Sequence, residues 1–274
     1  MTTSVDRCAC EDGRACEEGR ACEAAGGAQA GTAGAATCGE ERRLVYALLA
    51  RLLRKEVDEE LLAALKEDEV FVSDDEAFEH NLGLVRGYLA SPEATVLDLA
   101  RDYAHTFCGA GSTKKSSAYP FESVYTSKDG LLMQDARDGA LAWYRRFGLT
   151  KSESWLDCED HVALELEFME YLIGMEAEAR AAGRADEADD LLRSQRDFAR
   201  EHLANWLPRF AHDVDAKART DFYRGLVRFA NSYVKRDLAA LDDALAEAGE
   251  TAEAGTATEA KAAAEAEGGA RKAS

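Results

Sequence analysis

The apolar residues of this chain recur at helical spacing over nearly all of its middle part, which limits the folds it can adopt. Leu44, Leu48, Leu49 and Leu52 lie three or four residues apart, the spacing that places side chains on one face of an α-helix. No segment of the sequence shows the apolar–polar alternation of a half-buried strand. We therefore expect an all-α fold, a single globular domain of about seven helices. The expected helices span residues 40–54, 73–90, 91–109, 131–147, 158–182, 185–212 and 215–240.

Local signals mark several helix ends. Ser73 is followed three residues later by Glu76, the pattern of a capping box at a helix N-terminus. Ser91 precedes Pro92, and proline is favoured at the first helical position. Glycine commonly ends a helix because it adopts the left-handed backbone conformation without strain. The glycines that we expect to end helices are Gly109, Gly148 and Gly183.

The two ends of the chain have a different composition from the middle. Residues 1–39 are mostly Ala, Gly, Cys and Glu, and residues 247–274 contain no aromatic and no branched aliphatic residue. Such segments bury too little apolar surface to offset the loss of chain entropy on folding. We therefore expect two disordered arms around one folded domain at residues 40–246.

The chain is strongly acidic, with a formal net charge of −20. Each arm holds six acids and three bases, which leaves −14 on residues 40–246. This charge argues against a nucleic-acid partner, because phosphates would be repelled. Residues 56–79 alone hold eleven acids and a single base, Lys66. That segment is either a solvated surface or a site for a basic partner.

The seven cysteines indicate a reducing, cytoplasmic setting rather than a disulfide framework. Their number is odd, no secretory signal precedes them, and no run of about 18 apolar residues predicts a membrane span. The spacing of the five arm cysteines matches no zinc motif built from C-x-x-C pairs, although a metal-binding arm stays an alternative. They are Cys8, Cys10, Cys16, Cys22 and Cys38, followed by Cys108 and Cys158 in the middle of the chain.

Motifs of common enzymes are missing from the sequence. No histidine has a glutamate three residues before it, as a ferritin-like dimetal site requires, and there is no HExxH pair. The segment "GAGSTKK" (residues 109–115) lacks the spacing of a phosphate-binding loop and follows a helix rather than a strand. Ser123 is not within a G-x-S-x-G turn. We expect no metal, no cofactor and no catalytic residue.

A polar pair lies within the apolar face of one predicted helix. On a wheel of about 100° per residue, His161 lies within about 20° of Phe168 and Leu172, and Glu165 lies about 40° away. Burying such groups costs free energy unless they form hydrogen bonds. The pair is therefore either a structural link between the helix and a loop or a polar anchor at the floor of a binding groove.

Several motifs, in order along residues 40–240, closely resemble the TorD/DmsD/NarJ family of chaperones for molybdenum-containing reductases. The resemblance is closest to the TorD/DmsD subgroup because of the segment "YPFESVY". The other motifs are L-x-x-x-Y-x-x-x-F (Leu99, Tyr103, Phe107), "DH" followed by "ELEFM", "HLANWLPRF" and "DFYRGLVRFANSYVKRD". The resemblance implies an all-helical cytoplasmic chaperone, not an enzyme. It would bind the twin-arginine signal peptide and the body of a molybdopterin oxidoreductase catalytic subunit until the cofactor is inserted.

The resemblance also implies a peptide-binding groove. Its residues would be Tyr103, Thr106, Phe107, Pro120, Phe121, Asp160 and His161, supported by Glu122, Ser123, Tyr125 and Glu165. The family often has tryptophan where Tyr103 and Phe121 stand and an aliphatic residue where Thr106 stands. Pro120 would stiffen the loop, Phe121 would form an aromatic wall beside Tyr103, and Asp160 would meet the arginine pair by charge-assisted hydrogen bonds.

Two other interpretations remain open from the sequence. A helical enzyme or nucleotide-binding protein could use Asp160, His161 and Glu165 as a polar cluster. An interaction protein could bind a metal or a redox partner through its cysteine-rich arm. Turnover or a stoichiometric metal in the purified protein would favour these alternatives, whereas saturable binding of a twin-arginine peptide would favour the chaperone.

Overall fold

A computed structural model describes the backbone of residues 30–67, 71–73, 75–109 and 117–270, and side chains between residues 39 and 247 of these ranges. The described chain is helical, which confirms the predicted fold class. The elements are α1 (Ala30–Arg54), α2 (Glu59–Glu67), α3 (Glu76–Leu89), α4 (Val96–Thr106), α5 (Glu122–Thr126), α6 (Asp135–Arg146), α7 (Val162–Ala181), α8 (Ala185–Ala199), the π-helix η1 (Arg200–Ala204), α9 (Leu207–Lys217) and α10 (Asp221–Ala270).

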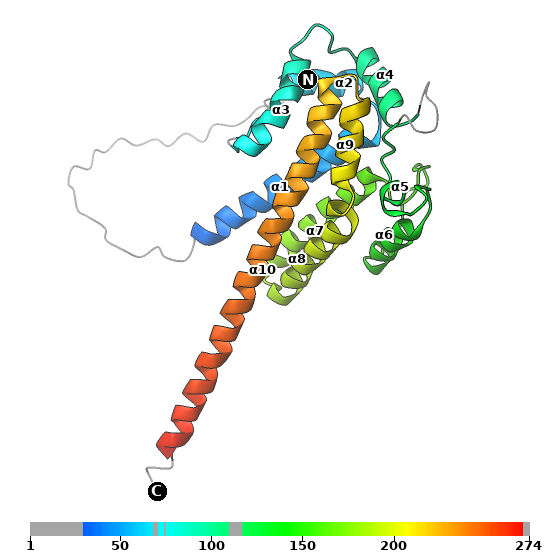
Figure 1. Ribbon diagram of the computed structural model, residues 1–274. Helices are drawn as coiled ribbons and strands as arrows, with labels where there is room; N and C mark the ends of the chain where they lie inside the picture. Colours follow the sequence, from blue (N-terminus) through cyan, green and yellow to red (C-terminus); the bar gives the residue numbers. More distant parts are fainter. Residues whose placement is uncertain (1–29, 68–70, 74, 110–116, 271–274) are drawn as a thin grey trace, which may run out of the picture.

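Two packed groups of helices form the body of the molecule. α7 packs against both α1 and α8, and the first half of α10 packs along α3 and also contacts α8 and α9 (Figure 1). Arg42 of α1 joins the groups by donating hydrogen bonds of 2.6 and 3.0 Å to both carboxylate oxygens of Asp237 of α10. The hydroxyl of Tyr46 donates to the same carboxylate at 2.9 Å. This buried polar link fixes α1 against α10.

Large aromatic side chains fill the core between these helices. Trp206, Tyr46, Tyr223, Phe198 and Phe210 are each almost fully removed from solvent. Burial of this kind supplies most of the stabilising free energy of a helical domain, at about 25 cal/mol per Å² of apolar surface. None of the helices in the described part of the chain is long and apolar enough to cross a membrane.

The close approach of α3 and α10 depends on one glycine. A Cβ atom at Gly225 would lie 2.5 Å from the carbonyl oxygen of Asn81 and 2.8 Å from Cγ2 of Val85. Contacts this short to backbone require that the helices move apart. A side chain at position 225 would therefore disrupt the packing of α10 on α3.

The predicted helix starts at Ser73 and Ser91 are wrong, whereas the predicted glycine ends are close to correct. Asp75 is the N-cap of α3 and accepts a hydrogen bond of 2.9 Å from the N–H of Ala77, while Ser73 only accepts one from Asp75. Thr95 is the N-cap of α4, because Ser91 belongs to a turn that follows α3. The glycines after α6 and α7, Gly148 and Gly183, have φ of 71° and 73°, the left-handed conformation expected there.

The expected helices in the C-terminal half also have different bounds in the structure. The segment predicted as one helix from 185 to 212 consists of α8, η1 and α9, because Pro208 in the first turn of α9 has no N–H with which to continue the preceding helix. The helix expected to begin at 215 is α10, which begins at Asp221. The segment between the expected helices that end at 109 and begin at 131 contains the short helix α5.

The proposed arms are only partly within the described residues. α1 begins at Ala30 and α10 continues to Ala270, so helices extend into both predicted arms (Figure 1). Among the described side chains of α10, the last buried one is Leu241. The cysteines at positions 8, 10, 16 and 22 lie outside the described residues. The domain limits at 40 and 246 stay a prediction.

Candidate functional site

Two of the segments singled out in the sequence meet in a short strand-like pairing. An antiparallel β-bridge joins Phe121 and His161, and backbone hydrogen bonds of 2.9 Å on either side fix its register. The bridge brings together four of the predicted groove residues, Pro120, Phe121, Asp160 and His161. The order of the chain alone does not show this contact, because the two segments are separated by α5 and α6.

His161 caps the helix that follows it. It is the N-cap of α7, and its Nδ1 accepts a hydrogen bond of 3.1 Å from the N–H of Ala163. Its ring packs edge-on against Phe121 and Trp155, with centroids 5.0 and 5.2 Å away. Burial, together with the positive charge of Arg54, lowers the pKa of His161 to about 3. The imidazole is therefore neutral at physiological pH, with its proton on Nε2, as the accepted bond at Nδ1 requires.

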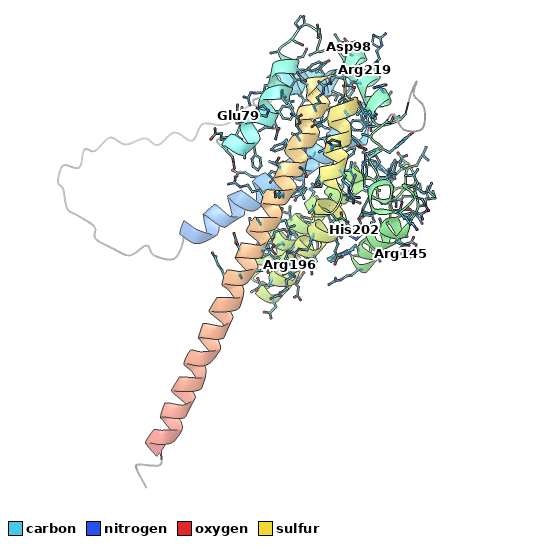
Figure 2. The ribbon with its side chains drawn as sticks, viewed as in Figure 1. Glu79, Asp98, Arg145, Arg196, His202 and Arg219 are labelled. Atoms are coloured by element: carbon cyan, nitrogen blue, oxygen red, sulfur yellow. The ribbon has the colours of Figure 1, made fainter. Side chains whose placement is uncertain are left out.

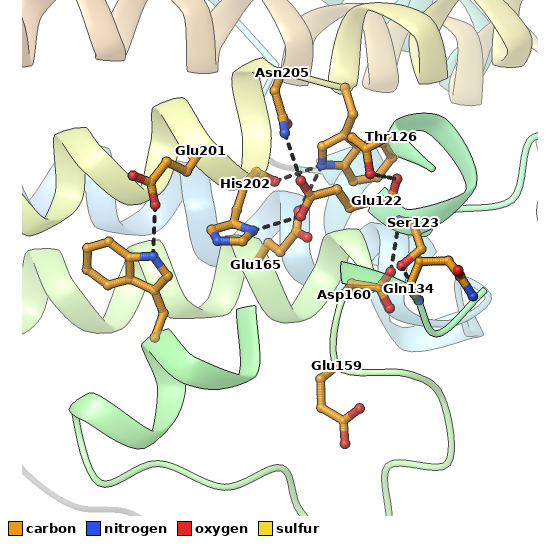
Figure 3. A network of polar contacts seen from close by, with 12 residues as sticks. Glu122, Ser123, Thr126, Gln134, Glu159, Asp160, Glu165, Glu201, His202 and Asn205 are labelled. Carbon is orange, nitrogen blue, oxygen red and sulfur yellow. Dashed lines mark hydrogen bonds and ion pairs between the residues drawn. The ribbon is translucent and has the colours of Figure 1, made fainter. Parts of the chain in front are cut away.

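Asp160 is fully buried and only half satisfied. Its Oδ2 accepts a hydrogen bond of 2.9 Å from the N–H of Ser123, near the start of α5. Its Oδ1 is buried and has no hydrogen-bond partner among the described residues. Ser123 in turn accepts a bond of 3.2 Å from the N–H of Gln134 through its hydroxyl (Figure 3). An unpaired buried carboxylate oxygen is costly, so Oδ1 is available for a donor from a ligand.

Glu122 lies at the centre of a buried network that ties α5 to η1 (Figure 3). It is the first residue of α5 and is 2% exposed. Its Oε2 lies 2.8 Å from Nδ1 of His202, and its Oε1 accepts a bond of 2.8 Å from Nδ2 of Asn205. His202 belongs to η1, on the side of the bundle where α5 and α6 lie (Figure 2). Glu122 therefore anchors the start of α5 to η1.

Glu165 is a second buried carboxyl group beside this network. Its Oε2 accepts a hydrogen bond of 3.1 Å from Nε1 of Trp206, while its Oε1 has no partner among the described residues. Burial and the neighbouring carboxyl groups of Glu122 and Asp160 raise the pKa of Glu165 well above its usual range. Donor atoms of Glu122, Glu165 and His202 all lie within 4.8 Å of one another, so these side chains could hold a metal ion.

The remaining predicted groove residues pack in the core on the other side of Tyr125. The hydroxyl of Tyr103 donates to the carbonyl of Leu53 at 3.1 Å, and the hydroxyl of Thr106 donates to Asp102 at 2.9 Å. A row of ring contacts continues from the Tyr103 side to the network of Glu122. It runs through Phe107, Phe210, Tyr125 and Trp206. Within the described residues, Phe121 makes its ring contact with His161 rather than with Tyr103 or Phe107.

The predicted groove residues lie in the interior of this structure rather than along an open groove. Tyr103, Thr106, Phe107, Asp160 and His161 are at most 5% exposed, and Phe121 is 9% exposed. An open apolar cleft of about 380 Å³ lies elsewhere, between α1, α3 and α10. The residues that sequence reasoning missed are His202, Asn205 and Trp206. All three belong to the quoted motif "HLANWLPRF", which was the available signal.

Known proteins are similar to this chain over most of its length. A family model described as the nitrate reductase delta subunit matches residues 72–212, more than half of the chain. The chaperone protein TorD of Photobacterium profundum is 28% identical over 212 residues, 74% of this chain and 94% of that protein. TorD of Vibrio cholerae El Tor is 28% identical over 216 residues, 76% of this chain and 95% of that protein. The perchlorate reductase assembly chaperone protein of Dechloromonas aromatica is 34% identical over 125 residues, 44% of this chain and 53% of that protein.

In this helical fold, the motifs "YPFESVY", "DH" and "HLANWL" meet at the buried network around Glu122. The chain belongs to the nitrate reductase delta subunit family, the TorD/NarJ family of redox enzyme maturation chaperones. The expected family membership is thereby confirmed.

Proposed function

We propose that this protein is a chaperone that binds the twin-arginine leader of a molybdopterin oxidoreductase catalytic subunit and holds that subunit until its cofactor is inserted. The family match over residues 72–212 is the observation that carries the proposal. The curated relatives are named as chaperones, and one of them is named as an assembly chaperone of perchlorate reductase, which supports a redox-enzyme client. The proposed location is the cytoplasm, where cofactor insertion would precede export.

The chemistry of Asp160 supports recognition of an arginine. Its Oδ1 is buried without a partner in the described chain, and a guanidinium group would supply the charge-assisted donor that it lacks. The net charge of −20 also favours encounter with a basic leader. Both observations fit the arginine-binding role that the resemblance implies for Asp160.

The burial of the proposed groove residues gives the proposal a structural requirement. The segment around Phe121 would have to separate from the segment around His161 before a peptide could reach Asp160. The contacts to be broken are one β-bridge, the hydrogen bond from Ser123 to Asp160, and the ring contacts that Phe121 and Trp155 make with His161. Leu156, next to Trp155, is 92% exposed and so does not hold the segment closed.

The polar cluster supports the alternative catalytic function less well. Asp160 bonds the backbone of α5, His161 caps α7 through its ring nitrogen, and Glu165 bonds Trp206. Each side chain thus performs a separate structural task, and a neutral histidine of low pKa is a weak base.

Co-purification tests the chaperone function directly. The full chain would be co-expressed with an oxidoreductase catalytic subunit of the same genome that has a twin-arginine leader, and with the same subunit lacking that leader. We expect a complex with the leader-bearing subunit and a higher molybdopterin content in that subunit when the chaperone is present. Failure to bind the leader-bearing subunit, with no effect on its cofactor content, would refute the proposal.

A further inference from the structure

Three side chains with metal-binding atoms converge inside the bundle from three separate elements. Glu122 comes from α5, Glu165 from α7 and His202 from η1, and one donor atom of each lies within 4.8 Å of the others. All three are buried, at 2%, 0% and 6% exposure. Carboxylate oxygens and an imidazole nitrogen at such separations can share one cation, which needs donor atoms about 2.0–2.3 Å from its centre.

Hydrogen bonds on the outer side of the cluster orient the two carboxyl groups. Asn205 binds Oε1 of Glu122 at 2.8 Å, and Nε1 of Trp206 binds Oε2 of Glu165 at 3.1 Å. These bonds leave Oε2 of Glu122 and Oε1 of Glu165 as the oxygens without an outer partner; Oε2 lies 2.8 Å from Nδ1 of His202. Metal ligands in proteins are typically held in this way by partners on their far atoms.

The unpartnered oxygen of Glu165 is an independent sign of a missing partner. Glu165 is fully buried, and its Oε1 accepts no hydrogen bond from the described residues. Nearly all buried polar atoms in proteins have a partner, and exceptions call for an explanation such as an ion. A cation between Glu165 and Glu122 would satisfy this oxygen.

The backbone around His202 is unusual in a way that serves the cluster. Residues Arg200–Ala204 form a π-helix, a rare element that is frequent at functional sites. The wider turn of the π-helix directs His202 toward Glu122 and places Trp206 beside Glu165. Nε1 of Trp206 also donates to the carbonyl of His202 at 2.7 Å. On the other edge of the ring, a Cβ at Gly139 would lie 2.9 Å from Cε1 of His202, so α6 packs closely against the imidazole.

We propose that Glu122, Glu165 and His202 bind one divalent transition-metal cation, of the class represented by Zn²⁺. Two oxygens and one imidazole nitrogen suit first-row transition metals, whereas Mg²⁺ and Ca²⁺ prefer all-oxygen sites. A cation held by three protein ligands keeps one coordination position open for water or for a side chain of the client protein. Asn205, which bonds Glu122, is exposed, so the cluster lies one side chain away from solvent. On binding, the cation replaces the protons held between these side chains, which pass to solvent.

The test must separate this site from the cysteines of the N-terminal arm, because cysteine thiolates are also ligands for Zn²⁺. The full chain with serine in place of Cys8, Cys10, Cys16, Cys22 and Cys38 removes that contribution. Calorimetric titration with Zn²⁺ after chelator treatment should show about one site per chain, and Mg²⁺ should not compete for it. In ¹⁵N-histidine-labelled protein, Zn²⁺ should shift one of the five imidazole signals, the one that is lost in His202→Gln.

Variants in the same background decide whether the cluster is the site. Glu165→Gln keeps the shape of the neutral acid and should weaken Zn²⁺ binding more than about 100-fold, while Trp206→Phe, which removes an outer bond, should weaken it about 10–100-fold. Glu201→Gln alters an exposed acid next to His202 and should leave affinity unchanged. Circular dichroism would check that each variant is folded. Any one of three results would overturn the proposal. They are the absence of saturable Zn²⁺ binding, a histidine spectrum that Zn²⁺ leaves unchanged, and equal Zn²⁺ affinity in folded Glu165→Gln.

Discussion

Nδ1 of His202 lies 2.8 Å from Oε2 of Glu122, across 80 residues of sequence, and both side chains are buried. This contact ties the short helix α5 to the π-helix η1. Because each group would lose a buried partner, we expect Glu122→Gln and His202→Ala each to lower the free energy of unfolding by roughly 1–3 kcal/mol. The double variant should lose less than the sum of the two, by at least about 0.5 kcal/mol. Urea denaturation of the four proteins measures these values.

A neighbouring exposed residue provides the control for this comparison of single and double variants. Glu201 precedes His202 on the same turn and is exposed, so Glu201→Gln should change the stability by no more than about 0.5 kcal/mol. Strictly additive losses in the double variant would mean that Glu122 and His202 contribute independently.

Burial of His161 should make the stability depend on pH. In the folded protein its pKa is about 3, whereas in the unfolded chain it is near 6.5, so the unfolded chain binds more protons between these values. Stability from this group is therefore complete above about pH 6.5 and decreases on acidification, by up to about 1.4 kcal/mol per pH unit. His161→Asn keeps an N-cap acceptor for Ala163 but cannot titrate. Its unfolding free energy should fall less steeply between pH 6.5 and 4.

The exposed residue His80 serves as the control for the pH experiment. His80→Asn shows what the loss of one imidazole away from the core does to the profile. Equal slopes for His161→Asn and the wild type would show that His161 does not titrate as its burial predicts.

The two ends of the chain should be dispensable for folding. A protein lacking residues 1–39 and 247–274 keeps Arg42, Asp237 and every core residue that is buried among the described side chains. We expect its thermal midpoint to lie within about 3 °C of that of the full chain, a change below about 1 kcal/mol, with unchanged affinity for a leader peptide. Differential scanning calorimetry checks the first value. A cooperative loss of structure would place part of the core outside residues 40–246.

The fold class was accessible from the sequence because apolar spacing reports directly on helices. The helix starts were less accessible, because several polar residues near residue 75 can cap a helix and the backbone decides among them. Ser73 and Asp75 illustrate this: both accept hydrogen bonds near the start of α3, but only Asp75 caps it. The break of the long segment 185–212 could have been predicted from Pro208.

The composition of the site depends on contacts between distant segments, which a single sequence does not show. The position of His161 and Glu165 on the apolar face of a predicted helix correctly indicated that both are buried. Both side chains are at most 3% exposed. From the sequence, the two side chains are interpreted as a pair. In the structure, His161 is instead the N-cap of α7, and Glu165 accepts a hydrogen bond from Trp206. The partnership of Glu122 with His202 had no local signal, because it requires that α5 and η1 meet.

Asp160 should contribute to peptide binding more than to stability. Asp160→Asn keeps an oxygen that can accept the N–H of Ser123 but removes the negative charge. A hydrogen bond to a charged group is worth about 1.5–3 kcal/mol, so leader affinity should fall by about tenfold or more. The comparison variant is Glu167→Gln, since Glu167 pairs with Arg54 on a partly exposed surface. If both folded variants bind a leader peptide as the wild type does, Asp160 is not part of the arginine site.

Calorimetric titration of the full chain with a client leader peptide tests the central claim most directly. A second titration uses the same peptide with lysines in place of its two arginines. Lysine keeps the positive charge but lacks the planar fork that binds a carboxylate through two hydrogen bonds. We predict saturable binding of the arginine peptide at about one peptide per chain, and binding of the lysine peptide weaker by about tenfold or more. No detectable binding of the arginine peptide, or equal affinity for the two peptides, would contradict the assignment of this protein as a twin-arginine leader chaperone.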